Sequence, residues 1–371
     1  MRIAILMLAC SDYEALELSL ACHGTFMPKD THFVILQNCR GTYDAERTLA
    51  TARRFQRQYP DRVTIVDSIP PGAPYRTIAA LLKSEIFADI DFVCKVDDDA
   101  FPIADGWLTK LKETYISATI DGIEPAYVTP LINNNTWGFA EILEIMSLRD
   151  EYITNIAKPH FVGCGSGGDN PLRVIAKEDI FTGGHGTIWG SPHVARWIHE
   201  KTTMVPNVYI QATARLSPKD ISVADRYSIG CILFRKELWG LIDDGGDDDE
   251  HMFHQYCQTT GSRIVCARSV PFVHIAYFSQ RDENRDIVPK ARAVYEDYLN
   301  LPWPIAMRAT RELEIEARLR WMEGQGAVAF GPAGVSTSAG TIAGMTPEQF
   351  AVRAARGLVN EIARKLRLKN R

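Results

Sequence analysis

The feature that most constrains the fold is a repeated alternation of short apolar runs and helical patterns over the first 100 residues. The runs RIAILML, HFVILQ, RVTIVD and DFVCKVD are apolar almost throughout, which predicts strands buried on both faces. Between them, YEALELSLACHG, DAERTLATARRFQRQYP and YRTIAALLKSEIFA have the periodicity of helices. Such strands, separated by helices, predict an α/β fold with a parallel sheet covered on both sides.

Composition and charge fit such a fold. The 371 residues are 46% hydrophobic and 23% charged, enough for a substantial core, and the net charge of −5 argues against nucleic-acid binding. No apolar run reaches the roughly 18–20 residues that cross a bilayer, and the N-terminal MRIAILMLAC is too short for a secretion signal. The eight cysteines show no CxxC pair, so we expect reduced thiols without a disulfide framework, in a cytoplasmic protein.

Three consecutive aspartates, Asp97, Asp98 and Asp99, end the fourth apolar run. Side chains alternate along a strand, so Asp97 and Asp99 should project to one side and Asp98 to the other. Parallel sheets bind ligands at the carboxyl ends of their strands, and two carboxylates there can hold Mg²⁺ or Mn²⁺. A bound cation would also relieve the repulsion between like charges. We therefore predict a divalent-metal site; the alternative is a solvated acidic turn.

The surrounding stretch, YRTIAALLKSEIFADIDFVCKVDDDAF, resembles the donor-binding half of GT-A glycosyltransferases with a DxD motif. Its KVDDDAF core is most similar to β-1,3-galactosyltransferases and fringe enzymes, within a family 2-like pattern. This resemblance implies a nucleotide-sugar donor, usually UDP-linked, whose diphosphate is bridged to the protein by Mn²⁺ or Mg²⁺. It also implies that Asp99 binds the metal directly, that Asp97 contacts the ribose or the metal through water, and that Asp98 orients nearby groups.

A second acidic motif supports the same resemblance. DEHMFHQYCQTTG, residues 249–261, is similar to the helix of inverting GT-A enzymes in which an acidic pair precedes a glycine by about eleven residues. Attack by an acceptor hydroxyl needs a carboxylate to take its proton, and Asp249 or Glu250 suits that role. The order of the two acids is reversed here, which leaves open which one is the base. The alternative is that these acids cap the helix and complement its dipole.

His274, in PFVHIAYF, lies thirteen residues beyond Gly261. The superfamily often places a third metal ligand at this position, so the resemblance implies that His274 completes the metal site with Asp97 and Asp99. The alternative is a core histidine whose ring nitrogens are satisfied by the protein.

Donor contacts are expected at the ends of the first three strands and on the helix before the aspartates. The two basic residues on that helix match a YR…K pattern of the family with two extra residues between them. The expected contacts are Ser11, Asn38, Asp67, Arg76 and Lys83, together with Asp97 and Asp98.

Two stretches could supply the glycine-rich strand beneath the acceptor, TGGHGTIWGSPHV or YSIGCILFRKELW. The second leads at a better distance into the acidic helix, and we prefer it. The first would then belong to an insertion in which His185 and Trp189 line the acceptor pocket.

These patterns predict a single GT-A domain of α/β class, Rossmann-like, with a mainly parallel sheet flanked by helices and a helical C-terminal extension. The domain covers residues 1–280, with a nucleotide-sugar-binding half (1–100) and an acceptor half (101–280). A helical extension (281–323), a flexible Gly/Ala/Ser/Thr-rich linker (324–346) and a basic amphipathic helix (347–371) follow. Such a basic helix favours peripheral contact with the inner face of a membrane, docking on its own domain or self-association.

The expected function is metal-dependent, inverting transfer of a hexose from a nucleotide diphosphate sugar, UDP-linked, to a glycan or lipid-linked acceptor in polysaccharide biosynthesis. One alternative is a sugar-phosphate nucleotidyltransferase, but the stretch after the first strand, ACSDYEALE, lacks the glycine-rich basic loop of such enzymes. A glycosidase also uses paired carboxylates but needs no DxD at a strand end. The non-enzymatic alternative is a nucleotide-sugar-binding protein on the same fold.

Overall fold

The structure is a computed structural model that describes residues 1–10, 12–37, 43–67, 74–157, 160–163, 172–175, 188, 191–224, 226–242, 248–276 and 280–299. The chain divides into two compact units, Met1–Ala317 and Arg318–Arg371, and the described residues all belong to the first. The predicted linker and basic helix, and the candidates Ser11, Asn38, His185 and Trp189, lie outside the described residues.

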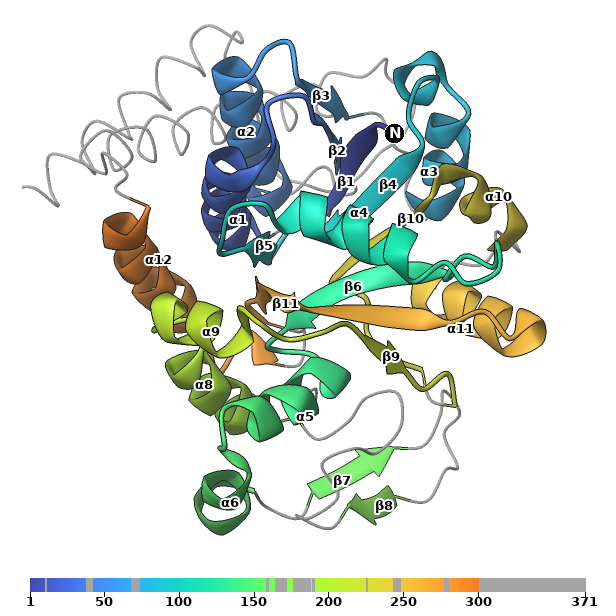
Figure 1. The fold of residues 1–371 in the computed structure, drawn as a ribbon. Helices are drawn as coiled ribbons and strands as arrows, with labels where there is room; N and C mark the ends of the chain where they lie inside the picture. Colours follow the sequence, from blue (N-terminus) through green and yellow to red (C-terminus); the bar gives the residue numbers. More distant parts are fainter. Residues whose placement is uncertain are drawn as a thin grey trace, which may run out of the picture. The chain divides into compact units, whose positions relative to one another are not determined.

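The N-terminal half forms the predicted parallel sheet. Four strands are neighbours in the order β3-β2-β1-β4 and all their pairings are parallel (Figure 1). They are β1 (Ile3–Ala9), β2 (His32–Gln37), β3 (Val63–Val66) and β4 (Phe92–Asp97). The helices between them are α1 (Tyr13–Phe26), α2 (Tyr43–Gln58) and α3 (Pro74–Leu82), with the short helix η1 (Glu85–Phe87) before β4. The α/β expectation is confirmed for this half.

The second half makes the sheet mixed, which corrects the expectation of a mainly parallel one. Strand β10 (Cys231–Arg235) runs antiparallel between β4 and β6 (Tyr127–Ile132). Strand β11 (Ile264–His274) is parallel to β6 but antiparallel to β5 (Ala100–Pro102) and β9 (Lys219–Ile221). The reversal arises because β10 enters from the carboxyl end of β4, so its first residue, Cys231, pairs with Val96. Two further strands, β7 (His160–Gly163) and β8 (Leu172–Ile175), form a separate antiparallel pair.

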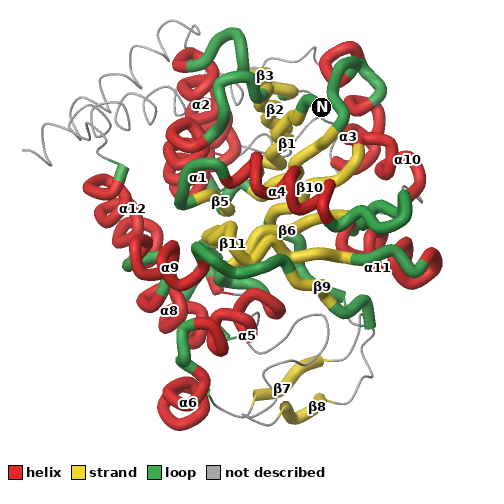
Figure 2. The backbone as a smooth tube through the Cα atoms, in the orientation of Figure 1, coloured by secondary structure: helices red, strands yellow, loops and turns green. Residues whose placement is uncertain are grey.

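Helices cover both faces of this sheet (Figure 2). Apolar side chains of α2 and α4 (Trp107–Ser117) pack on one face, in a cluster that includes Phe33, Phe55 and Trp107. The other face is covered by α3 and the helices of the second half, in a cluster that includes Trp239 and Phe253. Those helices are α5 (Thr136–Ile145), α8 (Pro192–Lys201), α9 (Pro206–Thr213), α10 (Trp239–Ile242), α11 (Asp249–Thr260) and α12 (Ile287–Tyr298). The remaining short helices are α6 (Arg149–Glu151), η2 (Tyr152–Ile156) and η3 (Lys236–Leu238).

Helix α12 lies within the predicted extension and packs on the sheet domain. Arg292 Nη2 donates to Glu17 Oε2 of α1 at 2.7 Å. Tyr295 is fully buried, and its ring meets that of Phe101 edge-on with centroids 5.4 Å apart. This part of the extension therefore belongs to the same compact unit as the sheet.

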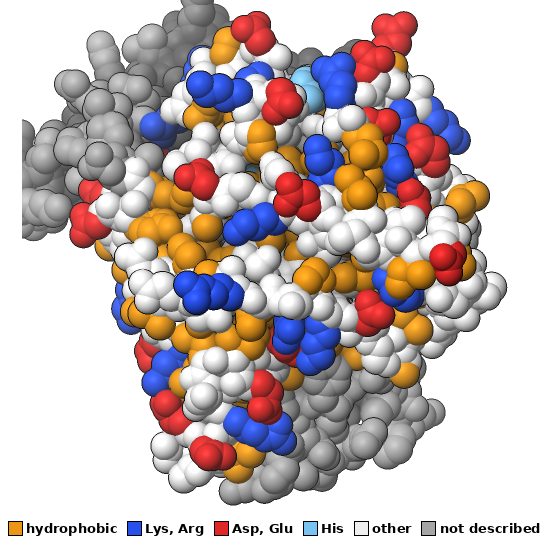
Figure 3. All heavy atoms as spheres, in the orientation of Figure 1, with side chains coloured by type: hydrophobic (Ala, Val, Ile, Leu, Met, Phe, Trp, Pro, Cys, Tyr) orange, Lys and Arg blue, Asp and Glu red, His pale blue; other side chains and the backbone are white. Residues whose placement is uncertain are grey.

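The cysteines depart from the sequence expectation at one position. Cys22, Cys94, Cys231, Cys257 and Cys266 are free and buried, as expected, but Cys10 is disulfide-bonded, so the expectation of reduced thiols is wrong at this position. Among the described residues, no helix combines the length and apolar character needed to cross a bilayer. On the face drawn in Figure 3, basic and acidic side chains are interspersed, with no broad basic surface of the kind that binds nucleic acid.

Candidate functional site

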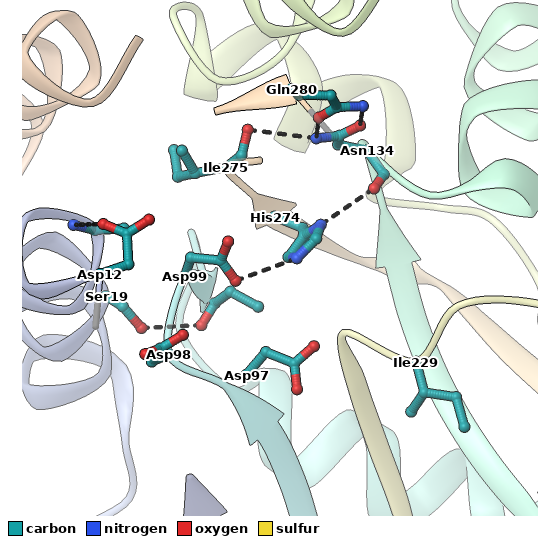
Figure 4. A network of polar contacts seen from close by, with 12 residues as sticks. Asp12, Ser19, Asp97, Asp98, Asp99, Asn134, Ile229, His274, Ile275 and Gln280 are labelled. Atoms are coloured by element: carbon teal, nitrogen blue, oxygen red, sulfur yellow. Dashed lines mark hydrogen bonds and ion pairs between the residues drawn. The ribbon is translucent and has the colours of Figure 1, made fainter. Parts of the chain in front are cut away.

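The three aspartates lie at the carboxyl end of β4, and their side chains alternate as predicted. Asp98 turns toward β1, where its Oδ2 accepts a hydrogen bond from the Cys10 amide at 2.9 Å. Asp99 faces the opposite way, toward the end of β11 (Figure 4). The turn that follows is held by α1, because Ser19 Oγ donates to the Ala100 carbonyl at 3.0 Å. The acidic turn is thus fixed to the sheet and to α1 rather than solvated.

Asp99 and His274 form the centre of the site. The Nε2 atom of His274 lies 3.1 Å from Asp99 Oδ1, and both side chains are buried. Its Nδ1 atom lies 3.2 Å from the Asn134 carbonyl, which can only accept, so Nδ1 carries a proton. A proton or a cation is then required between Nε2 and the carboxylate. Burial opposes the charged imidazole, but Asp99 outweighs it and raises the pKa of His274 to about 9.

The two acidic motifs meet through a lysine. Lys95 Nζ lies 2.8 Å from Asp249 Oδ2 and 3.2 Å from Asp97 Oδ1. Asp249 Oδ1 also accepts from the Tyr75 hydroxyl of α3 at 3.1 Å. Burial disfavours the ammonium of Lys95, yet the two carboxylates hold its pKa well above the usual range. Asp97 and Asp249 are therefore brought together as predicted, but around a cation that belongs to the chain itself.

The acids at the start of α11 have separate roles. Asp248 caps the helix by accepting from the His251 amide at 3.1 Å, and Gly261 ends it with a φ of 71°. Glu250 Oε1 accepts from the Ile229 amide at 3.1 Å, next to β10. Burial first, and then the neighbouring charge of Asp249, raise the pKa of Glu250 to about 7. Glu250 therefore changes charge near neutral pH.

An arginine that the sequence analysis missed lies beside Asp99. Arg281 Nη2 is 3.6 Å from Asp99 Oδ2, and its Nε is 3.4 Å from Asp12 Oδ2. Asp12 itself caps α1 by accepting from the Ala15 amide at 3.2 Å. Arg281 follows no recognisable motif, so only the tertiary structure brings it to this site.

A buried polar network behind His274 was also missed. Asn133 Oδ1 accepts from the His274 amide at 3.0 Å, and Asn134 Nδ2 donates to Gln280 Oε1 at 2.9 Å. His199 Nε2 lies 2.6 Å from the Ile275 carbonyl. The signal was present in the sequence, because the asparagines directly follow the strand YVTPLI in the same way that the aspartates follow β4.

The predicted donor contacts are spread along the sheet. Asp67 directly follows β3 and lies 3.3 Å from Arg53 of α2. Arg76 is exposed on the first turn of α3, beside Tyr75. Lys83 lies beyond the other end of α3, about 10 Å from Arg76 along the helix axis, where it lines a 640 Å³ cavity with Lys236 and Trp239. This placement does not bring Lys83 to Asp97 or Asp99, because α3 runs back along the sheet toward the start of β4.

The atoms of Asp99 and His274 that face each other are of the kinds that ligate a divalent cation. Asp99 Oδ2 is a buried oxygen without a hydrogen-bond partner among the described residues, and the Nδ1 proton of His274 leaves Nε2 as the ligating nitrogen. Within the described ranges, no three His, Cys, Asp or Glu side chains already form a metal-binding group. A cation would therefore have to draw Asp97 away from Lys95 or complete its shell with other oxygens.

Comparisons with known proteins give distant structural likenesses. No family model and no curated protein matches the chain. A mannosyltransferase from Pyrobaculum calidifontis, in complex with GDP-Man and Mn²⁺, is 14% identical over 96% of this chain and 80% of its own, with a TM-score of 0.37. An inositol-1-phosphate CTP transferase from T. maritima is 9% identical over 79% and 96%, with a TM-score of 0.33. A mannose-1-phosphate geranyltransferase from Thermus thermophilus is 10% identical over 73% and 76%, also at 0.33. These likenesses are too distant to assign an activity.

Proposed function

We propose that this chain is a metal-dependent, inverting glycosyltransferase that moves a hexose from a nucleotide diphosphate sugar, with a UDP-sugar as donor. The observation that supports it is the meeting of four groups from three distant segments at one sheet edge. Asp97 and Asp99 come from β4 and the turn after it, Asp249 from α11 and His274 from β11. Ligands of α/β sheets bind at this edge.

In this proposal, Asp99 and His274 Nε2 would hold Mn²⁺ or Mg²⁺, and Asp97 would contact the ribose or the metal through water. When bound, the metal supplies Lewis-acid neutralisation of the charge on the departing diphosphate. The Asn134 carbonyl fixes the imidazole by accepting from Nδ1 at 3.2 Å, the arrangement by which proteins orient metal-binding histidines. Asp98, bonded to the Cys10 amide, orients the turn that carries Asp99.

The proposed base is Glu250. An acceptor hydroxyl gives its proton to the Glu250 carboxylate while its oxygen bonds to C1 of the sugar. The bond from C1 to the diphosphate oxygen breaks on the opposite side, and the anomeric centre inverts. A base is most effective when its pKa lies near the working pH, and the pKa of Glu250 is raised to about 7. Asp249 is engaged by Lys95 and Tyr75, and in this proposal it positions them.

The nucleotide is proposed to lie over the ends of β1, β2 and β3, near Ser11, Asn38, Asp67 and Arg76. The acceptor of the transferred sugar is proposed to be a glycan or a lipid-linked saccharide in polysaccharide biosynthesis. Residues 347–371 would then provide contact with a membrane surface or with a second copy of the chain. Co-sedimentation with anionic vesicles, comparing the full chain with one that ends at residue 345, tests the membrane contact; equal binding by both would exclude it.

Two alternatives make different predictions at this site. A nucleotidyltransferase needs cations and glycines after β1, whereas the carboxylates of Asp12 and Asp98 are bonded to backbone amides there. These contacts favour the glycosyltransferase over the nucleotidyltransferase. A non-catalytic sugar-nucleotide-binding protein would bind the diphosphate but would release none from a nucleotide sugar.

The test is a thermal-shift series with UDP, GDP and CDP, each with and without Mn²⁺. A ligand that binds only the folded chain raises its apparent stability by mass action. Stabilisation by one diphosphate only in the presence of metal supports the proposal and identifies the nucleotide. A panel of nucleotide sugars, assayed for release of that diphosphate, then identifies the sugar. If none of the diphosphates stabilises the chain with Mn²⁺, the proposal is wrong.

A further inference from the structure

Arg281 has unused hydrogen-bonding capacity that faces the metal-binding carboxylate. Its guanidinium lies 3.6 Å from Asp99 Oδ2 and 3.4 Å from Asp12 Oδ2, whereas charge-assisted hydrogen bonds are about 2.7–2.9 Å long. Among the described residues, the buried Nε of Arg281 and the buried Oδ2 of Asp99 both have no hydrogen-bond partner. The side chain remains 40% exposed. The guanidinium therefore keeps only long ion-pair contacts with Asp12 and Asp99 and can donate shorter hydrogen bonds to a further anion.

The backbone on both sides of Arg281 is anchored by buried amides. Gln280 is fully buried; its Nε2 donates to the Ile188 carbonyl at 2.7 Å, and its Oε1 accepts from Asn134 at 2.9 Å. Asn284 Nδ2 donates to the Pro192 carbonyl at 2.8 Å. These bonds hold the described turn that presents Arg281, while the contacts of the guanidinium itself are long. Such preorganisation is typical of binding residues.

Charge balance points to an anionic ligand for Arg281. When a divalent cation occupies Asp99 and His274, the carboxylate is neutralised by the metal and no longer needs Arg281. A diphosphate on that metal would place negative oxygens beside the guanidinium, whose planar fork matches phosphate oxygens bidentately. We propose that Arg281 binds the diphosphate of the donor and stabilises it as the leaving group. This inference rests on the proposed function for the identity of the site.

The experiment measures binding rather than turnover. Affinities of the full chain for inorganic pyrophosphate and for UDP are measured by calorimetry at saturating Mn²⁺, for the wild type, Arg281→Met and Arg281→Lys. Arg285→Met is the matched control, because Arg285 is in the same segment, is 80% exposed and pairs with Asp282 at 2.6 Å. We expect Arg281→Met to weaken both ligands by about 10- to 100-fold, the loss of a charge-assisted contact. Arg281→Lys should retain part of the affinity, and Arg285→Met all of it.

The outcomes separate this inference from the proposed function. Pyrophosphate binding that depends on Arg281, in a chain that transfers no sugar, supports the inference and overturns the function. Sugar transfer with unchanged diphosphate affinity in Arg281→Met overturns the inference alone. If Arg281→Met instead binds Mn²⁺ more tightly and the diphosphate equally well, Arg281 is only a counter-ion of Asp99. A wild type that binds neither diphosphate overturns both.

Discussion

The ammonium of Lys95 lies 2.8 Å from the carboxylate of Asp249 and joins the interior of β4 to the first turn of α11. The two side chains are only 3% and 7% exposed. Because Lys95 also reaches Asp97 at 3.2 Å, one buried charge fixes the position of both acidic motifs. The relative position of the two acidic motifs therefore depends on Lys95, which comes between them in space and belongs to neither.

Replacing Lys95 with methionine should destabilise the chain strongly. Asp249 would remain buried without its cation, and breaking a buried pair by removing one partner costs about 3–5 kcal/mol. Urea unfolding measures the loss. The double variant Lys95→Met/Asp249→Leu removes both charges of the buried pair but leaves Asp97 without its cation, so it should recover part of the stability. If Lys95→Met has the same urea midpoint as the wild type, the pair of Lys95 and Asp249 contributes nothing to stability.

Asp99→Asn should abolish the Mn²⁺-dependent stabilisation by a nucleoside diphosphate while leaving the metal-free fold intact. The amide removes the charge that is proposed to bind the cation, but its oxygen can still accept from His274. Thermal shift with UDP and Mn²⁺ measures the effect. Asp282→Asn is the control, since Asp282 is 89% exposed and pairs only with Arg285 among the contacts described. A full metal-dependent shift in Asp99→Asn would exclude Asp99 as a ligand.

Glu250→Gln should slow transfer by about 10²- to 10⁴-fold while sparing diphosphate binding, because it removes the proposed base. Steady-state kinetics should also show kcat/KM of the wild type rising with pH to a plateau above about 7, where the carboxylate is ionised. The variant should lack that rise. If Asp249→Asn slows transfer more than Glu250→Gln does, the base is Asp249; if neither does, the assignment to this pair is wrong.

Glu250→Gln should also stabilise the folded chain relative to the wild type at high pH. The pKa of Glu250 is raised to about 7 by burial and by Asp249, so ionising it costs folding free energy. The free energy of unfolding of the wild type should therefore fall as the pH rises from the unfolded pKa of about 4.3 to the folded pKa of about 7. The stability gained by Glu250→Gln should grow over that window and then level off, as measured by urea unfolding at several pH values. A gain that is constant with pH would contradict the raised pKa.

Gly138→Ala should destabilise the chain, because a Cβ atom there would lie 1.9 Å from the Ile132 carbonyl oxygen at the end of β6. Overpacking of this kind costs roughly 1–3 kcal/mol, and here it would also disturb the Asn135 cap of α5. Gly240→Ala is the matched control in α10, where a Cβ atom meets nothing within 4 Å. That change should stabilise the helix slightly. Equal unfolding midpoints for the two variants would contradict the close contact.

Several elements of the fold and site could be predicted from local sequence. Strands β1 to β4 coincide with four apolar runs, and their parallel pairing was predicted from the helices between them. The opposite directions of Asp98 and Asp99 agree with the predicted alternation, although both residues lie in the turn after β4. The antiparallel entry of β10 could not be predicted, because a buried apolar strand has the same composition in either direction. The disulfide at Cys10 was missed because cysteine spacing does not report spatial proximity.

The sequence by itself determined which residue types could do chemistry: two acidic motifs, each at a recognisable boundary of a strand or helix, and a histidine at a strand end. Only the tertiary structure decided what each one faces. It set Lys95 between the motifs, bonded Nδ1 of His274 to a backbone carbonyl and brought Arg281 to Asp99. The reason is that charge, tautomer and pKa depend on neighbours within a few ångströms, and those neighbours come from segments that no local pattern connects.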